Sequence, residues 1–135
     1  MPRNRHMLMR LLSALLAVVA LTGAATAASS ALSGTYKTTI AGKPAALNGK
    51  WRLEFLPKNV LHTVRNGKLV VAGKAVAIGR SRLRISDRSG PYACSTSEGN
   101  GVYLYRRSGK RLTFTVVADK CIGRKLVLTT KPFLK

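Results

Sequence analysis

From Thr35 to the C-terminus, short runs rich in Val, Leu, Ile, Thr and aromatic residues recur between Gly, Asn and Pro, and no stretch keeps a helical period. Alternating apolar and polar side chains are typical of a strand with one buried face. The pattern predicts an all-β fold, with strands over residues 35–41, 49–56, 59–65, 68–78, 82–87, 100–107, 110–118 and 124–131. Most links between these runs are short, and short links join only antiparallel neighbours.

Eight antiparallel strands joined in sequence order favour an up-and-down barrel, because closure removes the exposed edges of an open sheet. A sandwich with Greek-key connections is the alternative, but it requires at least one long return connection. The interior of an eight-stranded barrel is either filled by side chains or holds one small ligand.

Turn residues set the expected register of the central strands. Asn66-Gly67 is a strong two-residue hairpin signal, because a type I′ turn needs positive φ at both positions. With a second turn at Pro57-Lys58, the pairing places one set of side chains inside the barrel. That set is Trp51, Leu53, Phe55, Val60, His62, Val64, Leu69 and Val71.

A hairpin turn at Ser108-Gly109 pairs Tyr105 with Leu112 and Tyr103 with Phe114 on the inner face. If the interior contains a cavity, the bulky inward residues are expected to line it. These residues are Trp51, Phe55, His62, Tyr103, Tyr105 and Phe114. The alternative is that they only fill the core, and a lone histidine on an apolar face is more often a core residue than a ligand contact.

The N-terminal residues 1–27 have the features of a secretory signal peptide. Arg3, Arg5 and Arg10 accompany an apolar run from Leu11 to Leu21, and Ala25-Thr26-Ala27 offers a cleavage site. A retained membrane anchor is the alternative, although the run is shorter than the roughly 20 apolar residues of a spanning helix. We therefore expect a secreted or envelope-associated protein with a single domain over residues 28–135.

The chain carries 24 Lys and Arg against 4 Asp and Glu, and without the three arginines of the signal peptide its net charge is +17. Such a field attracts anionic polymers and membrane headgroups, or serves only solubility. The basic residues predicted to face outward are Arg52, Arg82, Arg84, Arg106, Arg111 and Lys125. No aromatic residue accompanies them, which disfavours a specific nucleic-acid platform.

Cys94 and Cys121 lie 27 positions apart, near the base of the hairpin formed by the sixth and seventh predicted strands. An exported protein meets an oxidising compartment, so the two cysteines are expected to form a disulfide. A redox or metal site would require a C-x-x-C motif or a His/Cys cluster.

Few residues are available for catalysis. His62 is the only histidine after the signal peptide, and the chain has neither a G-x-S-x-G motif nor a glycine-rich phosphate loop. Asp119 is expected to pair with the basic Arg124 rather than act as a catalytic acid. The sequence thus predicts a non-enzymatic protein without a cofactor or metal.

Several motifs resemble the lipocalin-like barrels of the calycin group, and in particular small secreted bacterial proteins with that fold. The motifs are Gly34-Thr35-Tyr36, Gly49-Lys50-Trp51 as G-x-W, Gly90 with Cys94, Gly101-Val102-Tyr103, the D-x-C-x-x-R segment from Asp119 to Arg124, and Lys131-Pro132-Phe133. The resemblance implies that Arg124 packs over Trp51 and closes one barrel end. The G-x-W lies on the second predicted strand rather than the first, and Phe133 stands where the family has a Trp.

Two functions are expected from these observations. The first is a secreted, non-enzymatic lipocalin-like barrel that binds a small apolar ligand in its interior. The alternative is a basic surface-binding protein that attaches to anionic envelope polymers or membrane headgroups.

Overall fold

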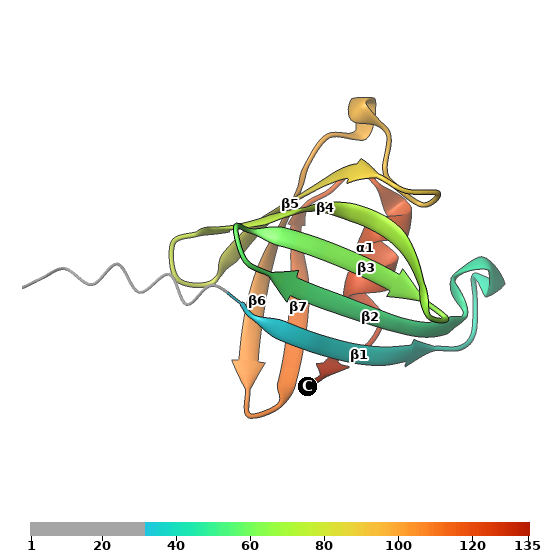
Figure 1. Cartoon of the computed structure of the whole chain (residues 1–135), viewed down its shortest axis with the longest axis horizontal. Coiled ribbons are helices and arrows are strands. Elements are labelled where there is room, and N and C mark those ends of the chain that lie inside the picture. Colours follow the sequence, from blue (N-terminus) through green and yellow to red (C-terminus); the bar gives the residue numbers. More distant parts are fainter. Residues whose placement is uncertain (1–31) are drawn as a thin grey trace, which may run out of the picture.

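The structure is a computed structural model that describes residues 32–135, so the predicted signal peptide lies outside the described residues. Eight antiparallel strands close into one barrel in sequence order (Figure 1). They are β1 (Gly34–Ile40), β2 (Gly49–Leu56), β3 (Val60–Arg65), β4 (Lys68–Ile78), β5 (Arg82–Ser89), β6 (Gly101–Ser108), β7 (Arg111–Ala118) and β8 (Phe133–Leu134). The short helices are η1 (Ala45–Leu47), η2 (Thr96–Glu98) and α1 (Ile122–Thr129).

The predicted all-β up-and-down barrel is confirmed, but the strand predicted over residues 124–131 is wrong. Helix α1 occupies most of that segment, and the barrel is closed by the two-residue strand β8, which pairs with both β1 and β7. The run Leu126-Val127-Leu128 does not alternate, so a strand would turn Val127 away from its apolar neighbours. In the helix, Val127 and Leu128 are both buried against the barrel.

The predicted register between β2 and β3 is wrong by one residue, so the faces of β3 are inverted. The connecting loop has three residues rather than two, and Lys58 and Asn59 adopt positive φ values of 61° and 60°. Because strand side chains alternate, an odd slip sends every inward residue outward. Leu61 therefore lies inside opposite Phe55, whereas His62 lies opposite Glu54 on the outer face.

The inverted faces of β3 also turn Val60 and Val64 away from the barrel interior, although Val64 remains buried. Val64 pairs with Leu69 as predicted, but a bulge in β4 brings Val70 into the core and leaves Leu69 49% exposed. Val71 beyond the bulge packs against the core. The predicted turn at Asn66-Gly67 is confirmed, with φ values of 48° and 80°.

The hairpin between β6 and β7 turns at Gly109-Lys110 rather than Ser108-Gly109, because Ser108 pairs with Arg111. Tyr105 consequently pairs with Phe114 instead of Leu112. This slip of two residues keeps each side chain on its face. The residues predicted to face inward are accordingly buried: Tyr103, Tyr105, Leu112 and Phe114.

Side chains fill the middle of the barrel. Tyr36, Leu53, Tyr103, Leu112 and Phe133 are completely buried. The rings of Tyr103 and Phe133 each meet the ring of Phe114 edge to face, with centroids 6.3 and 6.1 Å apart. A through-going central cavity is thereby excluded.

None of the helices within residues 32–135 is long and apolar enough to cross a membrane.

The β3 register predicts opposite effects for two neighbouring residues. Leu61→Ala removes a buried side chain and should lower the free energy of unfolding by about 2–5 kcal/mol. His62→Ala alters the outer face and should change it by no more than about 0.5 kcal/mol. Urea denaturation of both variants measures the difference, and a larger loss for His62→Ala than for Leu61→Ala would overturn this register.

Candidate functional site

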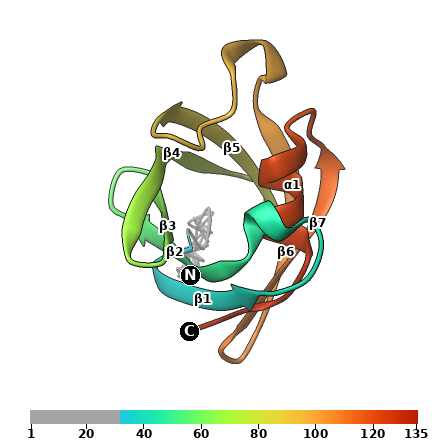
Figure 2. The same ribbon diagram turned by 90° about the vertical axis from the view of Figure 1, so that its right-hand side faces the viewer.

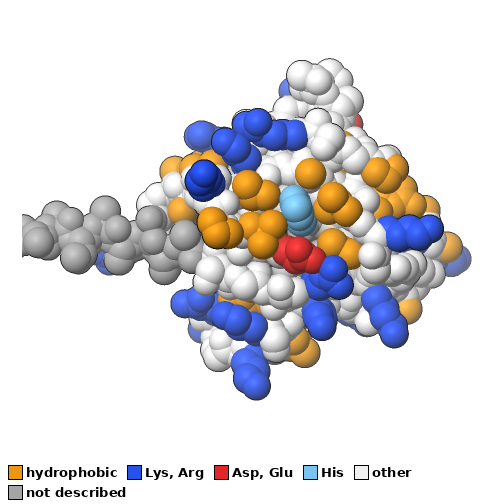
Figure 3. Space-filling model, viewed as in Figure 1, with side chains coloured by type: hydrophobic (Ala, Val, Ile, Leu, Met, Phe, Trp, Pro, Cys, Tyr) orange, Lys and Arg blue, Asp and Glu red, His pale blue; other side chains and the backbone are white. Residues whose placement is uncertain are grey.

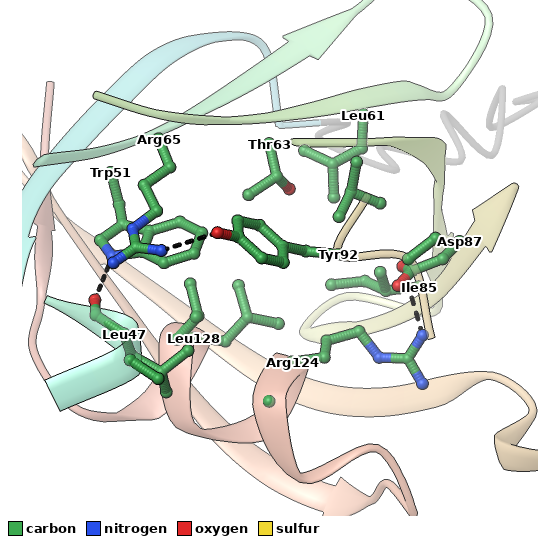
Figure 4. A pocket seen from close by; sticks show the side chains of 15 residues that line it. Leu47, Trp51, Leu61, Thr63, Arg65, Ile85, Asp87, Tyr92, Arg124 and Leu128 are labelled. Carbon is green, nitrogen blue, oxygen red and sulfur yellow. Dashed lines mark hydrogen bonds and ion pairs between the residues drawn. The ribbon is translucent and has the colours of Figure 1, made fainter. Parts of the chain in front are cut away.

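A cavity of about 200 Å³ lies at one end of the barrel, between the ends of the strands and the helices η1 and α1. Figure 2 looks toward this end, where both helices are visible. The lining is mainly apolar and comes from β2 to β5, both helices and the loop after β5. It comprises Ala46, Leu47, Trp51, Leu61, Thr63, Arg65, Val71, Ile85, Asp87, Tyr92, Ala93, Gly123, Arg124, Val127 and Leu128 (Figure 4).

Arg65, at the end of β3, is held against two aromatic rings in the cavity wall. The centre of its guanidinium lies 5.4 Å from the Trp51 ring centroid and 5.6 Å from that of Tyr92. Its Nη1 donates to the Tyr92 hydroxyl at 3.0 Å, and its Nε donates to the Asn48 carbonyl at 3.0 Å. Its Nη2 donates to the same Asn48 carbonyl. These contacts fix both the position and the plane of the cation.

The same residues fix the segment that carries η1. The Trp51 indole Nε1 donates to the Leu47 carbonyl at 2.7 Å, and Arg65 holds the next carbonyl, that of Asn48. The Lys50 amide in turn donates to the Asn66 side chain at 2.9 Å, which ties the start of β2 to the β3–β4 turn. Hydrogen bonds within the protein therefore hold this side of the cavity in place.

A buried ionic network forms the opposite wall. Arg124 on α1 donates from Nε to Asp119 Oδ2 at 2.7 Å and from Nη2 to Asp119 Oδ1 at 2.8 Å, a two-pronged pair. Its Nη1 lies 3.3 Å from Asp87 Oδ1, and Nη2 also donates to the Gly99 carbonyl at 2.9 Å. The side chains of Arg124, Asp87 and Asp119 are at most 6% exposed.

Three further groups donate to these carboxylates. The Tyr103 hydroxyl donates to Asp119 Oδ2, and the Cys121 amide donates to Asp119 Oδ1 at 2.8 Å. The Cys94 amide donates to Asp87 Oδ2 at 2.7 Å. The network thus joins β5, β6, the end of β7 and α1 through charge-assisted hydrogen bonds.

The environment of Asp119 shifts two pKa values in opposite senses. Burial alone would raise the pKa of the Asp119 carboxyl, but hydrogen bonds from Arg124, Tyr103 and the Cys121 amide outweigh it and hold the pKa below its usual range. Burial, and then the hydrogen bond to Asp119, raise the pKa of the Tyr103 hydroxyl. Asp119 is therefore a charged partner of Arg124 and Tyr103 is a neutral donor at physiological pH.

Cys94 and Cys121 form the predicted disulfide, with Cα atoms 6.0 Å apart. The bond joins the loop before η2 to the residue that caps α1. Each cysteine also supplies an amide to one carboxylate of the network, so the disulfide and the ion pairs hold the same helix terminus. A bridge over 27 positions stabilises the fold by about 3–4 kcal/mol in the chain-entropy model.

The structure separates the residues predicted to line a cavity. Trp51 lines the cavity, whereas Tyr103, Tyr105 and Phe114 belong to the filled core. Phe55 belongs to the core and borders a separate hollow at the opposite end, with Leu32 and Pro57. His62 points outward, for the reason of register given above.

The predicted closure of the barrel by Arg124 over Trp51 is wrong, because the cation over Trp51 is that of Arg65. Arg124 is committed to Asp119 and Asp87 across the cavity. The predicted Asp119–Arg124 ion pair is confirmed. Sequence reasoning missed Arg65 because the β3 faces were inverted, and it missed Tyr92 and Asp87 because both lie where the alternation breaks off.

The predicted basic residues lie in three settings. Arg82, Arg84, Arg106 and Arg111 are exposed on β5 to β7. Arg52 on β2 pairs with Glu54 at 2.7 Å, and Lys125 lies on α1 rather than on a strand. Lys and Arg side chains also surround an apolar area on the face shown in Figure 3.

The residues described contain no group of three or more His, Cys, Asp or Glu side chains placed to hold a metal ion. Comparison of the chain with protein-family models, with curated proteins and with solved structures gives no match.

Asp119→Asn should lower the free energy of unfolding at pH 7 by about 3–5 kcal/mol, because it leaves Arg124 buried without its main partner. Since the folded-state pKa of Asp119 lies below its unfolded value, its stabilisation is complete above about pH 4 and is lost as the pH falls through the folded-state pKa. Asp119→Asn should remove that part of the acid dependence. Urea denaturation from pH 7 to pH 2 measures both effects.

Glu54→Gln is the matched control, because the Arg52–Glu54 pair is partly exposed, with side chains 37% and 23% accessible. Its effect should stay within about 1 kcal/mol. Equal losses for the two variants would contradict a special role for the buried network.

Proposed function

We propose that this protein is a secreted, non-enzymatic barrel that binds one small, mainly apolar molecule in the cavity under α1. The observation that carries the proposal is the cavity itself: an apolar hollow at one end of a barrel whose middle is filled, walled by ordered polar groups on two sides. Concave, largely preformed and mainly apolar sites of this kind are where proteins bind small molecules.

The size of the cavity limits the ligand. A cavity of about 150 Å³ lined by apolar side chains accepts benzene, and this one measures about 200 Å³. The ligand that fits is accordingly built around a single ring or a short branched chain. A long-chain fatty acid would leave most of its length outside.

Tyr92 marks the entrance. It is 53% exposed, yet its ring borders the cavity and its hydroxyl accepts from Arg65. Tyr92 lies in the loop after β5, two residues before Cys94, which forms the disulfide with Cys121. A ligand that enters beside Tyr92 would contact the buried side chains of Leu61, Val127 and Leu128.

The proposal also includes a secreted location and a lipocalin-like relationship. The signal-like N-terminus and the disulfide support a secreted or envelope-associated location. The eight-stranded up-and-down barrel agrees with a lipocalin-like relationship, although the cation over its Trp51 comes from β3.

A second candidate function is attachment to anionic envelope polymers or membrane headgroups. It is favoured by the exposed arginines of three neighbouring strands, Arg82 and Arg84 on β5, Arg106 on β6 and Arg111 on β7. Binding of this kind weakens steeply between about 50 and 200 mM salt, whereas capture of an apolar molecule does not.

Filling the cavity should abolish binding of toluene, the simplest probe of its size. Val71→Phe places a ring in the cavity, while Val76→Phe makes the same change on the outer face of the same strand, opposite Arg84. Isothermal titration calorimetry should detect saturable toluene binding in the parent protein and in Val76→Phe, and none in Val71→Phe. The proposal fails if the parent protein takes up no toluene, or if both variants bind it equally.

A further inference from the structure

We propose that the cavity recognises the carboxylate of a small amphiphilic acid through Arg65, with the apolar body of the acid inside the barrel. This inference rests on the proposed function and names its ligand class. Arg65 is half-buried in the wall of an apolar cavity, which is an unusual place for a cation without an anionic partner.

Every acidic side chain of the chain is engaged away from Arg65. Glu54 pairs with Arg52, and both Asp87 and Asp119 pair with Arg124. Glu98 accepts from the Ser95 amide and hydroxyl in the capping box of η2. These are all four Asp and Glu residues of the protein, so no Asp or Glu side chain neutralises Arg65.

The Arg65 guanidinium still has donors to offer. It carries five N–H groups, and Nε, Nη1 and Nη2 each use one of them on the neutral oxygens of Asn48 and Tyr92. One N–H remains on each terminal nitrogen. A planar cation with a free N–H on each terminal nitrogen can donate to the oxygens of a carboxylate.

The environment of Arg65 strengthens that contact. The rings of Trp51 and Tyr92 cover part of the guanidinium and hold it in place, so little side-chain freedom is lost on binding. The exposed arginines elsewhere on the barrel lack this confinement. They contribute instead to a positive field that draws anions toward the protein.

The opposite wall sets the orientation of the ligand. Figure 4 shows Arg65 and Arg124 on opposite sides of the cavity, and Arg124 already faces two carboxylates. A ligand carboxylate there would meet Asp87, a like charge. The acid therefore places its head at Arg65 and its ring toward Leu61, Ile85 and Leu128.

The test compares 4-methylbenzoate with its neutral isostere 4-methylbenzamide at pH 7. Trp51 is the only Trp and lines the cavity, so its fluorescence reports binding of both probes, and calorimetry confirms the stoichiometry. The parent protein should bind the acid about tenfold more tightly than the amide, since hydrogen bonds between charged groups exceed neutral ones by that order. The preference should persist at about 200 mM salt, because the contact is partly buried.

Arg65→Gln should remove the preference for the acid, and an unchanged far-ultraviolet circular dichroism spectrum shows that the variant is folded. Arg65→Lys should keep only part of the preference, because an ammonium offers no planar fork. Arg84→Gln, on the exposed face of β5, is the control for the loss of one positive charge and should retain the full preference.

Equal affinity for acid and amide in the parent protein, or an unchanged preference in Arg65→Gln, would overturn this inference and leave the proposed function intact. If toluene, acid and amide all fail to bind the parent protein, the proposed function itself fails. If Arg84→Gln loses the preference as completely as Arg65→Gln, the effect is one of overall charge and the inference is again wrong.

Discussion

The buried pairing of Arg124 with Asp119 is the interaction on which this end of the molecule depends. It fixes the first turn of α1 to the end of β7, and through Asp87 and Gly99 it reaches β5 and the loop before β6. The disulfide between Cys94 and Cys121 holds the same corner covalently. Since Val127 and Leu128 follow on the same helix, the position of the cavity wall is a direct consequence of this anchor.

The middle of the barrel is filled by side chains, and the end under α1 contains the cavity. Tyr103 spans both: its ring packs in the core, while its hydroxyl donates to Asp119. Around the hollow end, Arg124 pairs with the carboxylates of Asp119 and Asp87, whereas Arg65 contacts only neutral oxygens and aromatic rings. That difference, more than the total charge of the protein, is the basis of the ligand preference that we propose for the cavity.

The sequence predicts the fold better than the site, and the difference follows from the period of a strand. The predicted register of the β6–β7 hairpin differs from the observed register by two residues. An even slip keeps each side chain on its face, so Tyr105 and Phe114 are buried as predicted. The loop at residues 57–59 uses Lys58 and Asn59 at positive φ without a glycine to mark it, and the resulting odd slip exchanged His62 for Leu61. The same slip assigns Arg65 to the outer face, whereas its side chain lines the cavity. The sequence does not predict α1, because the helix has only eight residues and their composition also suits a strand.

The most direct measurement of whether the cavity under α1 holds a ligand is a set of intermolecular nuclear Overhauser effects between bound 4-methylbenzoate and the methyl groups of the protein. A ring in the cavity should give contacts to the methyls of Leu61, Val127 and Leu128, which line it from β3 and α1. The ligand should give none to Leu69, which is exposed on the outer face of β4. Contacts to Leu69 alone, or no contacts at saturating ligand, would contradict this account.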